Sequence, residues 1–241
     1  MMSKIIRTEL YKLRHNMGFI VLMLVSVALY GGINYVSETS AEAVSAFTQM
    51  GSFSFLIPVF AAVATASIVC DDYQLKTMKN ILSSGVSRSS IFFGKYITSM
   101  LATFLLLLLD AAVTMIICVS FKGFGTHDVV MQQLLINIAL QTVVVLIFNT
   151  FSFVIASLLK SAKTTIILSA ILYLMDGAIF SGLANLTKIK MIDGLSLSMV
   201  ETDINHYAMG GNDYLILGGH LLLAVLLLMI ACAQFKKAEI K

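Results

Sequence analysis

The sequence predicts an all-α integral membrane protein with six transmembrane helices. Hydrophobic residues make up 59% of the 241 residues and charged residues only 12%, and the mean hydropathy is +0.93, well above that of soluble domains. Six mostly apolar segments approach the length of about 20 residues that a helix needs to cross a bilayer. The apolar composition implies that a lipid bilayer surrounds the chain. The net charge of +3 is small and scattered, so we expect no nucleic-acid partner.

The predicted spans belong to a single domain, 1–241, and cover about residues 17–36, 53–70, 97–119, 134–158, 164–184 and 214–234. Basic residues precede the first span as in a signal peptide, but this segment is long enough to span and lacks a small-residue cleavage site, so we expect a retained anchor. Pro58, the sole proline, predicts a kink near the start of the second span.

The distribution of basic residues predicts that both termini lie in the cytoplasm. With the N-terminus inside, the cytoplasmic segments hold 13 of the 16 Lys and Arg residues, and the external segments hold 3. Basic residues near span ends are retained on the cytoplasmic side. Residues 71–95 would then form a cytoplasmic loop between the second and third spans, and residues 185–213 an external segment with a short helix near 195–203.

Residues 1–16 have the pattern of an amphipathic helix that lies in the inner membrane interface. Two adjoining faces carry the apolar residues Ile6, Leu10, Leu13 and Met17 and the polar residues Lys4, Arg7, Tyr11 and Arg14. This arrangement suits a helix on an anionic membrane surface. The flank of a signal anchor is the alternative interpretation.

The loop at 71–95 predicts a short helix, a turn and the start of the third span. Leu75, Met78 and Leu82 recur at helical spacing. Asp71 and Asp72 would begin the first turn of this short helix, where carboxylates favour the positive end of the dipole.

The same loop then changes from helix to turn. Gly85 would end the short helix, and residues 87–90 offer Ser side chains as N-caps for the third span. Two interpretations remain open: a solvated connector whose bases obey the positive-inside rule, or a docking element that a soluble partner pushes.

Two acids lie within apolar spans, Asp110 in "LLLLLDAAVTM" and Asp176 in "LYLMDGAIF". A carboxylate at this depth costs about 3 kcal/mol on insertion scales, so each should face the bundle interior, a cavity or a partner. Asp110 is a candidate for a polar pathway or an interface, with a packing role as the alternative. A break of the fifth span near Gly177 and Gly182 would bring Asp176 close to the external edge.

A polar stripe follows one face of the fourth span. Its candidate pathway or interface residues are Asn137, Gln141 and Asn149. Such residues usually form hydrogen bonds between helices, and a polar route for an amphipathic substrate is the alternative.

The sequence offers no catalytic residues and no metal site. It contains no G-x-x-x-x-G-K-[ST] loop that would cradle the phosphates of a nucleotide. The four histidines are dispersed without metal-ligand spacing, and no spacing singles out a nucleophile. We therefore expect no reaction on this chain.

The cytoplasmic loop carries a specific run of residues, Asp72-Tyr73-x-x-Lys76-Thr77-Met78-Lys79-Asn80-Ile81-Leu82-Ser83-x-Gly85-Val86-Ser87-Arg88. This run resembles the first cytoplasmic loop of the type 2 ATP-binding-cassette (ABC) permeases. Asp72 stands where that family usually has Glu, and Lys76 where it usually has Gly. The layout of the whole chain is also similar, most of all to the small permeases of Gram-positive bacteria that export or confer resistance to bacitracin and lantibiotics.

The resemblance implies that the loop is a coupling helix, which docks on a partner ATPase. The coupling residues would be Asp71, Asp72, Tyr73, Leu75, Lys76, Thr77, Met78, Lys79, Asn80, Leu82, Ser83, Val86, Ser87 and Arg88. Two ATPase copies, which bind ATP and Mg, would lie beneath two permease chains, identical or related. This chain itself would hold no cofactor, and its external segment at 185–213 would be re-entrant.

The function that the resemblance implies is ATP-driven export through a bacterial cell membrane. The substrate would be amphipathic, such as an antimicrobial or toxin peptide or a lipid-like drug, and its export would confer immunity. A permease for ions or small drugs on the same fold is one alternative. A non-transporting membrane scaffold or peptide sensor is an alternative of another class.

Overall fold

The computed structural model describes residues 2–36, 56–83, 85–122, 131–188, 194–205 and 208–237. These residues form helices and connecting turns, and no strand occurs among them. The helices are α1 (Met2–His15), α2 (Met17–Val36), α4 (Leu56–Gln74), α5 (Met78–Ser83), α6 (Arg88–Lys122), α7 (Met131–Leu159), α8 (Ala162–Thr187), α9 (Leu197–Asn205) and α10 (Gly211–Lys237). The predicted all-α fold is confirmed.

Five of these helices, α4, α6, α7, α8 and α10, are long and apolar enough to cross a membrane. The pair α1 and α2 passes the same test as one broken unit, bent by 66°. Asn16 lies at the bend, and its side-chain oxygen accepts a hydrogen bond from the Gly18 N–H at 2.8 Å, as an N-cap does. The described residues therefore provide five spans, or six with the bent pair.

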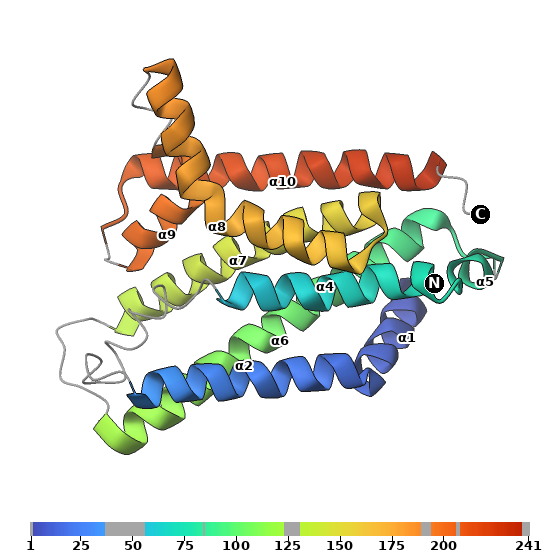
Figure 1. Ribbon diagram of the computed structural model, residues 1–241, viewed down its shortest axis with the longest axis horizontal. Coiled ribbons are helices and arrows are strands. Elements are labelled where there is room, and N and C mark those ends of the chain that lie inside the picture. The colour runs from blue at the N-terminus through green and yellow to red at the C-terminus, as the bar shows by residue number, and fades with distance from the viewer. Residues whose placement is uncertain are drawn as a thin grey trace.

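Helix α4 is the centre of the bundle and packs against α6, α7 and α8 (Figure 1). Its small side chains make this possible, because Ala61, Ala62, Ala64 and Ala66 are almost fully buried and let neighbouring backbones approach closely. Helices α1 and α2 pack against α6, and α10 packs against α7. Pro58 lies in the first turn of α4, where a proline removes no helical hydrogen bond.

The start of α1, the end of α10 and helix α5 lie at one end of the bundle (Figure 1). An aromatic cluster closes this end: the Phe92 ring of α6 lies 5.2 Å from that of Phe153 in α7 and 5.6 Å from that of Phe235 in α10. The shared position of the termini agrees with the prediction that both lie on one side of the membrane. The assignment of that side to the cytoplasm stays a prediction.

The boundary between the second span and the loop differs from the prediction. Helix α4 continues to Gln74, so that Asp71 and Asp72 lie in its last turn and not in the first turn of the following helix. In this last turn the buried carboxylate of Asp72 pairs with basic side chains of α1 and α6, as described below. Residues 53–55, the expected start of this span, lie outside the described residues.

The predicted apolar stripe of the short helix is also wrong. Helix α5 begins only at Met78, and Leu75 lies in the preceding turn with 71% of its surface exposed. Met78 is buried, with 2% exposed, and the Leu82 side chain lies outside the described residues. The interruption at Thr77 separates residues that a continuous helix would have aligned on one face.

Candidate functional site

The docking segment predicted from the sequence lies at the end of the bundle that holds both termini. It comprises the last turn of α4, helix α5 and the first turn of α6. On α5, Met78 and Ile81 pack into the core cluster, while Lys79, Asn80 and Ser83 are exposed. The segment therefore offers a polar face to solvent and is held from behind by apolar contacts.

Lys76 ends α4 in a left-handed conformation, with φ of 57°. Glycine adopts this conformation without steric cost and is the usual residue just beyond a helix end. The resemblance noted above has Gly at this position. The backbone geometry explains that preference, and it leaves Lys76 strained relative to glycine.

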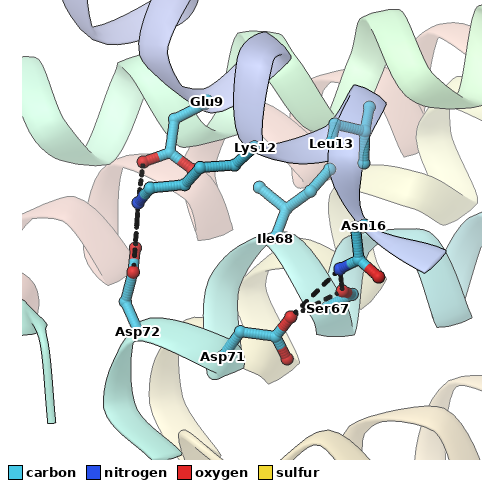
Figure 2. A pocket seen from close by; sticks show the side chains of 8 residues that line it. All are labelled: Glu9, Lys12, Leu13, Asn16, Ser67, Ile68, Asp71 and Asp72. Atoms are coloured by element: carbon cyan, nitrogen blue, oxygen red, sulfur yellow. Dashed lines mark hydrogen bonds and ion pairs between the residues drawn. The ribbon is translucent and has the colours of Figure 1, made fainter. Parts of the chain in front are cut away.

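Asp72 faces the interior and belongs to a cluster of four charged groups, three of which are buried. Its carboxylate accepts hydrogen bonds from Lys95 of α6 and from Lys12 of α1, whose Nζ lies 3.1 Å from Oδ1. Glu9 of α1 completes the cluster, with carboxylate oxygens 3.2 Å from the Lys12 Nζ and 3.3 Å from the Lys95 Nζ. Figure 2 shows Glu9, Lys12 and Asp72 pointing toward one another between α1 and the end of α4.

Further hydrogen bonds satisfy the remaining groups of this cluster. Lys95 also donates to the Ile68 carbonyl oxygen at 2.6 Å, and the Thr77 hydroxyl donates to Asp72 Oδ1 at 2.8 Å. Two ammonium and two carboxylate groups balance in charge, which lets a buried cluster persist in a low dielectric.

A second polar contact, one turn away, joins the bend between α1 and α2 to α4. The Ser67 hydroxyl donates to Asp71 Oδ2 at 2.8 Å, and the Asn16 amide donates to the Ser67 hydroxyl at 2.9 Å (Figure 2). Together the two contacts fasten the bend between α1 and α2 to the last turns of α4. Displacement of the docking segment must therefore move α1, α4 and α6 together, because separating them would leave charged groups unpaired.

A coupling residue that docks on an ATPase would face solvent, and this expectation is wrong for Asp72, which is 6% exposed. Its two basic partners come from α1 and α6, and burial follows from their positions. Met78 is likewise turned inward. Of the predicted coupling residues, the exposed ones are Leu75, Lys76, Lys79, Asn80, Ser83 and Ser87.

Other predicted coupling residues hold the segment in place. The Ser87 hydroxyl accepts a hydrogen bond from the Ser90 N–H at 3.3 Å, which confirms the predicted N-cap of α6. Arg88 Nη1 donates to the Lys236 carbonyl oxygen at 2.9 Å and ties α6 to the end of α10. The Lys160 Nζ lies 5.3 Å from the centre of the Tyr73 ring, within the range of a cation–π contact.

Sequence reasoning missed Lys12 and Lys95 as partners of Asp72, and Glu9 as the fourth member of the cluster. A signal exists, since Glu9 is the only acid among the first 16 residues and Lys95 stands alone within "IFFGKYI". A lone acid and a lone base on apolar faces are expected to pair when both become buried.

The polar residues of the fourth predicted span face the interior. Asn149 of α7 accepts from the Thr65 hydroxyl of α4 at 2.6 Å and donates to the Ser99 hydroxyl of α6 at 3.0 Å. All three side chains are almost fully buried. This network joins three helices, so Asn149 has the interhelical role that was one of the two interpretations.

Gln141 lines a cavity of about 420 Å³ that opens on the side of the bundle between α6 and α7. The wall is mainly apolar, with Phe104 and Leu108 among its residues, and Glu201 of α9 lies at its edge. Asn137, one turn before Gln141, is buried and is not one of the described residues that line this cavity.

Asp110 of α6 is fully buried opposite α2. Neither carboxylate oxygen has a hydrogen-bond partner among the described residues. Ser26 lies near, but its hydroxyl donates to the Met23 carbonyl oxygen at 3.0 Å. Asp110 therefore faces the bundle interior, as expected for a carboxylate at this depth.

Asp176 holds helix α9 against α8. Its Oδ2 accepts hydrogen bonds from the Ser196 hydroxyl at 2.9 Å and from the Ser198 N–H at 3.0 Å. A carboxylate at a helix N-terminus is favoured by the exposed amides and the dipole. Helix α8 turns away from the bundle in its C-terminal part (Figure 1). The two hydrogen bonds of Asp176 give it a structural role between α8 and α9.

Helix α9 lies where the sequence predicted a short external helix. Leu197, Val200 and Ile204 form its buried face, and the Tyr173 hydroxyl of α8 donates to Glu201 Oε2 at 3.2 Å. Among the described residues, no group of His, Cys, Asp and Glu side chains is arranged to hold a metal ion.

Comparison with known proteins assigns the chain to a family. Residues 5–177, from α1 to the middle of α8, match the family model described as ABC-2 family transporter protein. No curated protein matches the chain significantly. The matched region contains the whole ion cluster and the docking segment.

Members of this family are the membrane components of ABC transporters, and ATP hydrolysis belongs to a partner ATPase. The apolar helices agree with a multi-pass membrane protein. The chain belongs to the ABC-2 transporter family and is a transmembrane permease of an ABC transporter.

Proposed function

We propose that this permease exports an amphipathic substrate, such as an antimicrobial or toxin peptide or a lipid-like drug, from a bacterial cell membrane. Two permease chains, identical or related, would work with two ATPase copies that bind ATP and Mg. Export would protect the cell from the substrate.

The observation that carries the proposal is the cavity between α6 and α7. Its wall includes Phe104, Leu108 and Leu135, whose side chains are also exposed on the side of the bundle. In a membrane this surface faces apolar neighbours, so a molecule dissolved in the bilayer reaches the cavity without crossing water. Gln141 and Thr142 add polar groups to the same wall, which suits an amphipathic molecule.

The docking segment supplies the coupling in this proposal. An ATPase would contact the exposed face of α5 around Lys79 and Asn80. Because Met78 is anchored in the core and Asp72 is paired with α1 and α6, a push on α5 would be passed to three helices as a rigid-body displacement. Helix α6 carries one wall of the cavity, so this displacement would change its shape.

The test uses the tagged full chain, purified gently from its native membrane with whatever ATPase accompanies it. In proteoliposomes, we expect movement of a labelled amphipathic peptide that requires ATP. Lys79→Glu on the exposed face of α5 should weaken ATPase stimulation about tenfold, the usual scale for reversing a charge at an interface rim.

Lys188→Glu is the matched control, because Lys188 is exposed at the C-terminal end of α8, away from α5. It makes the same charge change and should leave stimulation unchanged. Equal effects of the two variants would contradict docking through α5. Peptide binding without ATP-dependent movement would favour a sensor or scaffold. If only ions or small drugs moved, they would replace amphipathic peptides as the proposed substrates.

A further inference from the structure

The helix stretches around the cavity between α6 and α7 carry acids but no Lys or Arg, whereas Lys95 and Lys163 lie nearer the beginnings of α6 and α8. No Lys or Arg occurs in residues 17–36, 56–75, 96–121, 131–159 or 194–235. Among the acids in these stretches, Asp110 and Glu201 are the buried ones outside the ion cluster.

The cavity between α6 and α7 brings one of these acids to an apolar binding surface. Glu201 is the sole ionisable residue among the described residues that line it, and Gln141 and Thr142 are the sole other polar ones. The volume of about 420 Å³ falls within the range of small-ligand sites, about 300–1,000 Å³. It suits a single head group and the adjoining apolar part, not a whole peptide.

Glu201 is held in position by the packing of its helix. Leu197, Val200 and Ile204 of α9 are almost fully buried, and Tyr173 donates a hydrogen bond to Glu201. The Glu201 residue is only 7% exposed. In such surroundings an opposite charge on a ligand gains more than in water, because the local dielectric is low.

We infer that this cavity is a binding site for the cationic head of an amphipathic amine, with Glu201 as the counter-charge and the α6 and α7 walls as the apolar contact. The inference rests on the proposed function and deepens it, since it assigns the charge of the cargo. Neutral molecules of the same shape would bind more weakly, and anionic ones would be repelled by Glu201.

A fluorescence experiment on the full chain measures this preference directly. The chain contains no tryptophan, so Phe104→Trp introduces a single reporter in the cavity wall. Ile116→Trp places the same reporter on an exposed part of α6 outside the described lining, and it reports partitioning into the bilayer. The probes are brominated alkyl compounds of equal chain length that end in an amine, an alcohol or a carboxylate.

In proteoliposomes of zwitterionic lipid, the amine should quench the Phe104→Trp reporter saturably, at about tenfold lower concentration than the alcohol, after correction with the Ile116→Trp reporter. The carboxylate should quench least. Glu201→Gln should abolish the difference between amine and alcohol. Asp203→Asn, which removes a carboxylate from the same helix but not from the described lining, should preserve it.

Equal corrected quenching by the three probes would overturn the inference, as would an unchanged amine preference in Glu201→Gln. The probe series needs no Glu201 variant, so the test stands even if that variant misfolds. Binding is measured without ATPase or ATP. Loss of the charge preference with intact ATP-driven transport would refute this inference alone, whereas a charge preference without ATP-driven transport would refute the proposed function and leave the site in place.

Discussion

Replacement of Lys95 by Met should destabilise the protein severely, because Lys95 is the buried base of the ion cluster. Its side chain is 3% exposed and donates to Asp72, to Glu9 and to the Ile68 carbonyl oxygen. Lys95→Met keeps an apolar stem of similar length but changes the net charge of the cluster from 0 to −1. Removing one partner of a buried ion pair costs about 3–5 kcal/mol, and we expect a loss in free energy of unfolding of this size.

Lys12 offers a matched comparison within the same cluster. It contacts the same two carboxylates, but its side chain is 44% exposed, so water replaces much of what Lys12→Met removes. A partly solvated pair contributes about 1 kcal/mol. We therefore expect a large loss in free energy of unfolding for Lys95→Met and a small loss for Lys12→Met, although the two substitutions are chemically identical.

Restoring charge balance should recover stability. Lys95→Met combined with Asp72→Asn leaves Glu9 paired with Lys12, and the double variant should be about 1–3 kcal/mol more stable than Lys95→Met alone. This recovery separates unpaired buried charge from simple loss of packing, since the second substitution restores no apolar contact.

The cysteines of the chain provide the assay. Cys70 of α4 and Cys232 of α10 are buried free thiols, and their labelling by a thiol-reactive dye during titration with denaturing detergent reports unfolding of two separate helices. A Cys118→Ser background removes the third thiol. If Lys95→Met and Lys12→Met lower the free energy of unfolding equally, or if Asp72→Asn brings no recovery, the cluster does not act as a buried charge-balanced unit.

Two further outcomes follow from backbone geometry and close packing. Lys76→Gly should raise the free energy of unfolding by about 1 kcal/mol, because it relieves a left-handed residue. Lys79→Gly within α5 should lower the free energy of unfolding by about 1 kcal/mol. Equal shifts in the two variants would argue against strain at Lys76. Gly94→Ala should cost about 1–3 kcal/mol, since its Cβ would lie 2.6 Å from the Ile5 Cγ2. Ile5→Ala should relieve that cost, and Gly182→Ala, with open space around it, should be neutral or stabilising by thermal unfolding.

The candidate site was only partly predictable, and Asp72 illustrates why. The motif around it located the docking segment, because residue types at short spacing are read directly from the chain. The direction of its side chain depends on Lys12 and Lys95, and Lys12 lies 60 positions away in sequence. Similarly, the predicted Ser87 cap is a local contact and was correct. The helix proposed to begin at Asp71 was wrong, because Asp71 and Asp72 lie in the last turn of α4, where Asp72 pairs with bases of other helices.

The sequence alone determined that this is an all-α membrane protein with a polar, basic loop and no nucleotide-binding loop, because hydropathy, helical period and short motifs are properties of neighbouring residues. It also showed that the chain places acids within or beside its apolar segments. The tertiary structure decided the role of each acid. Asp72 lies in an ion cluster, Asp176 of α8 binds the start of α9, and Glu201 lines an apolar cavity. These roles depend on contacts between helices far apart in the chain, which form only when the bundle packs and which no local pattern encodes.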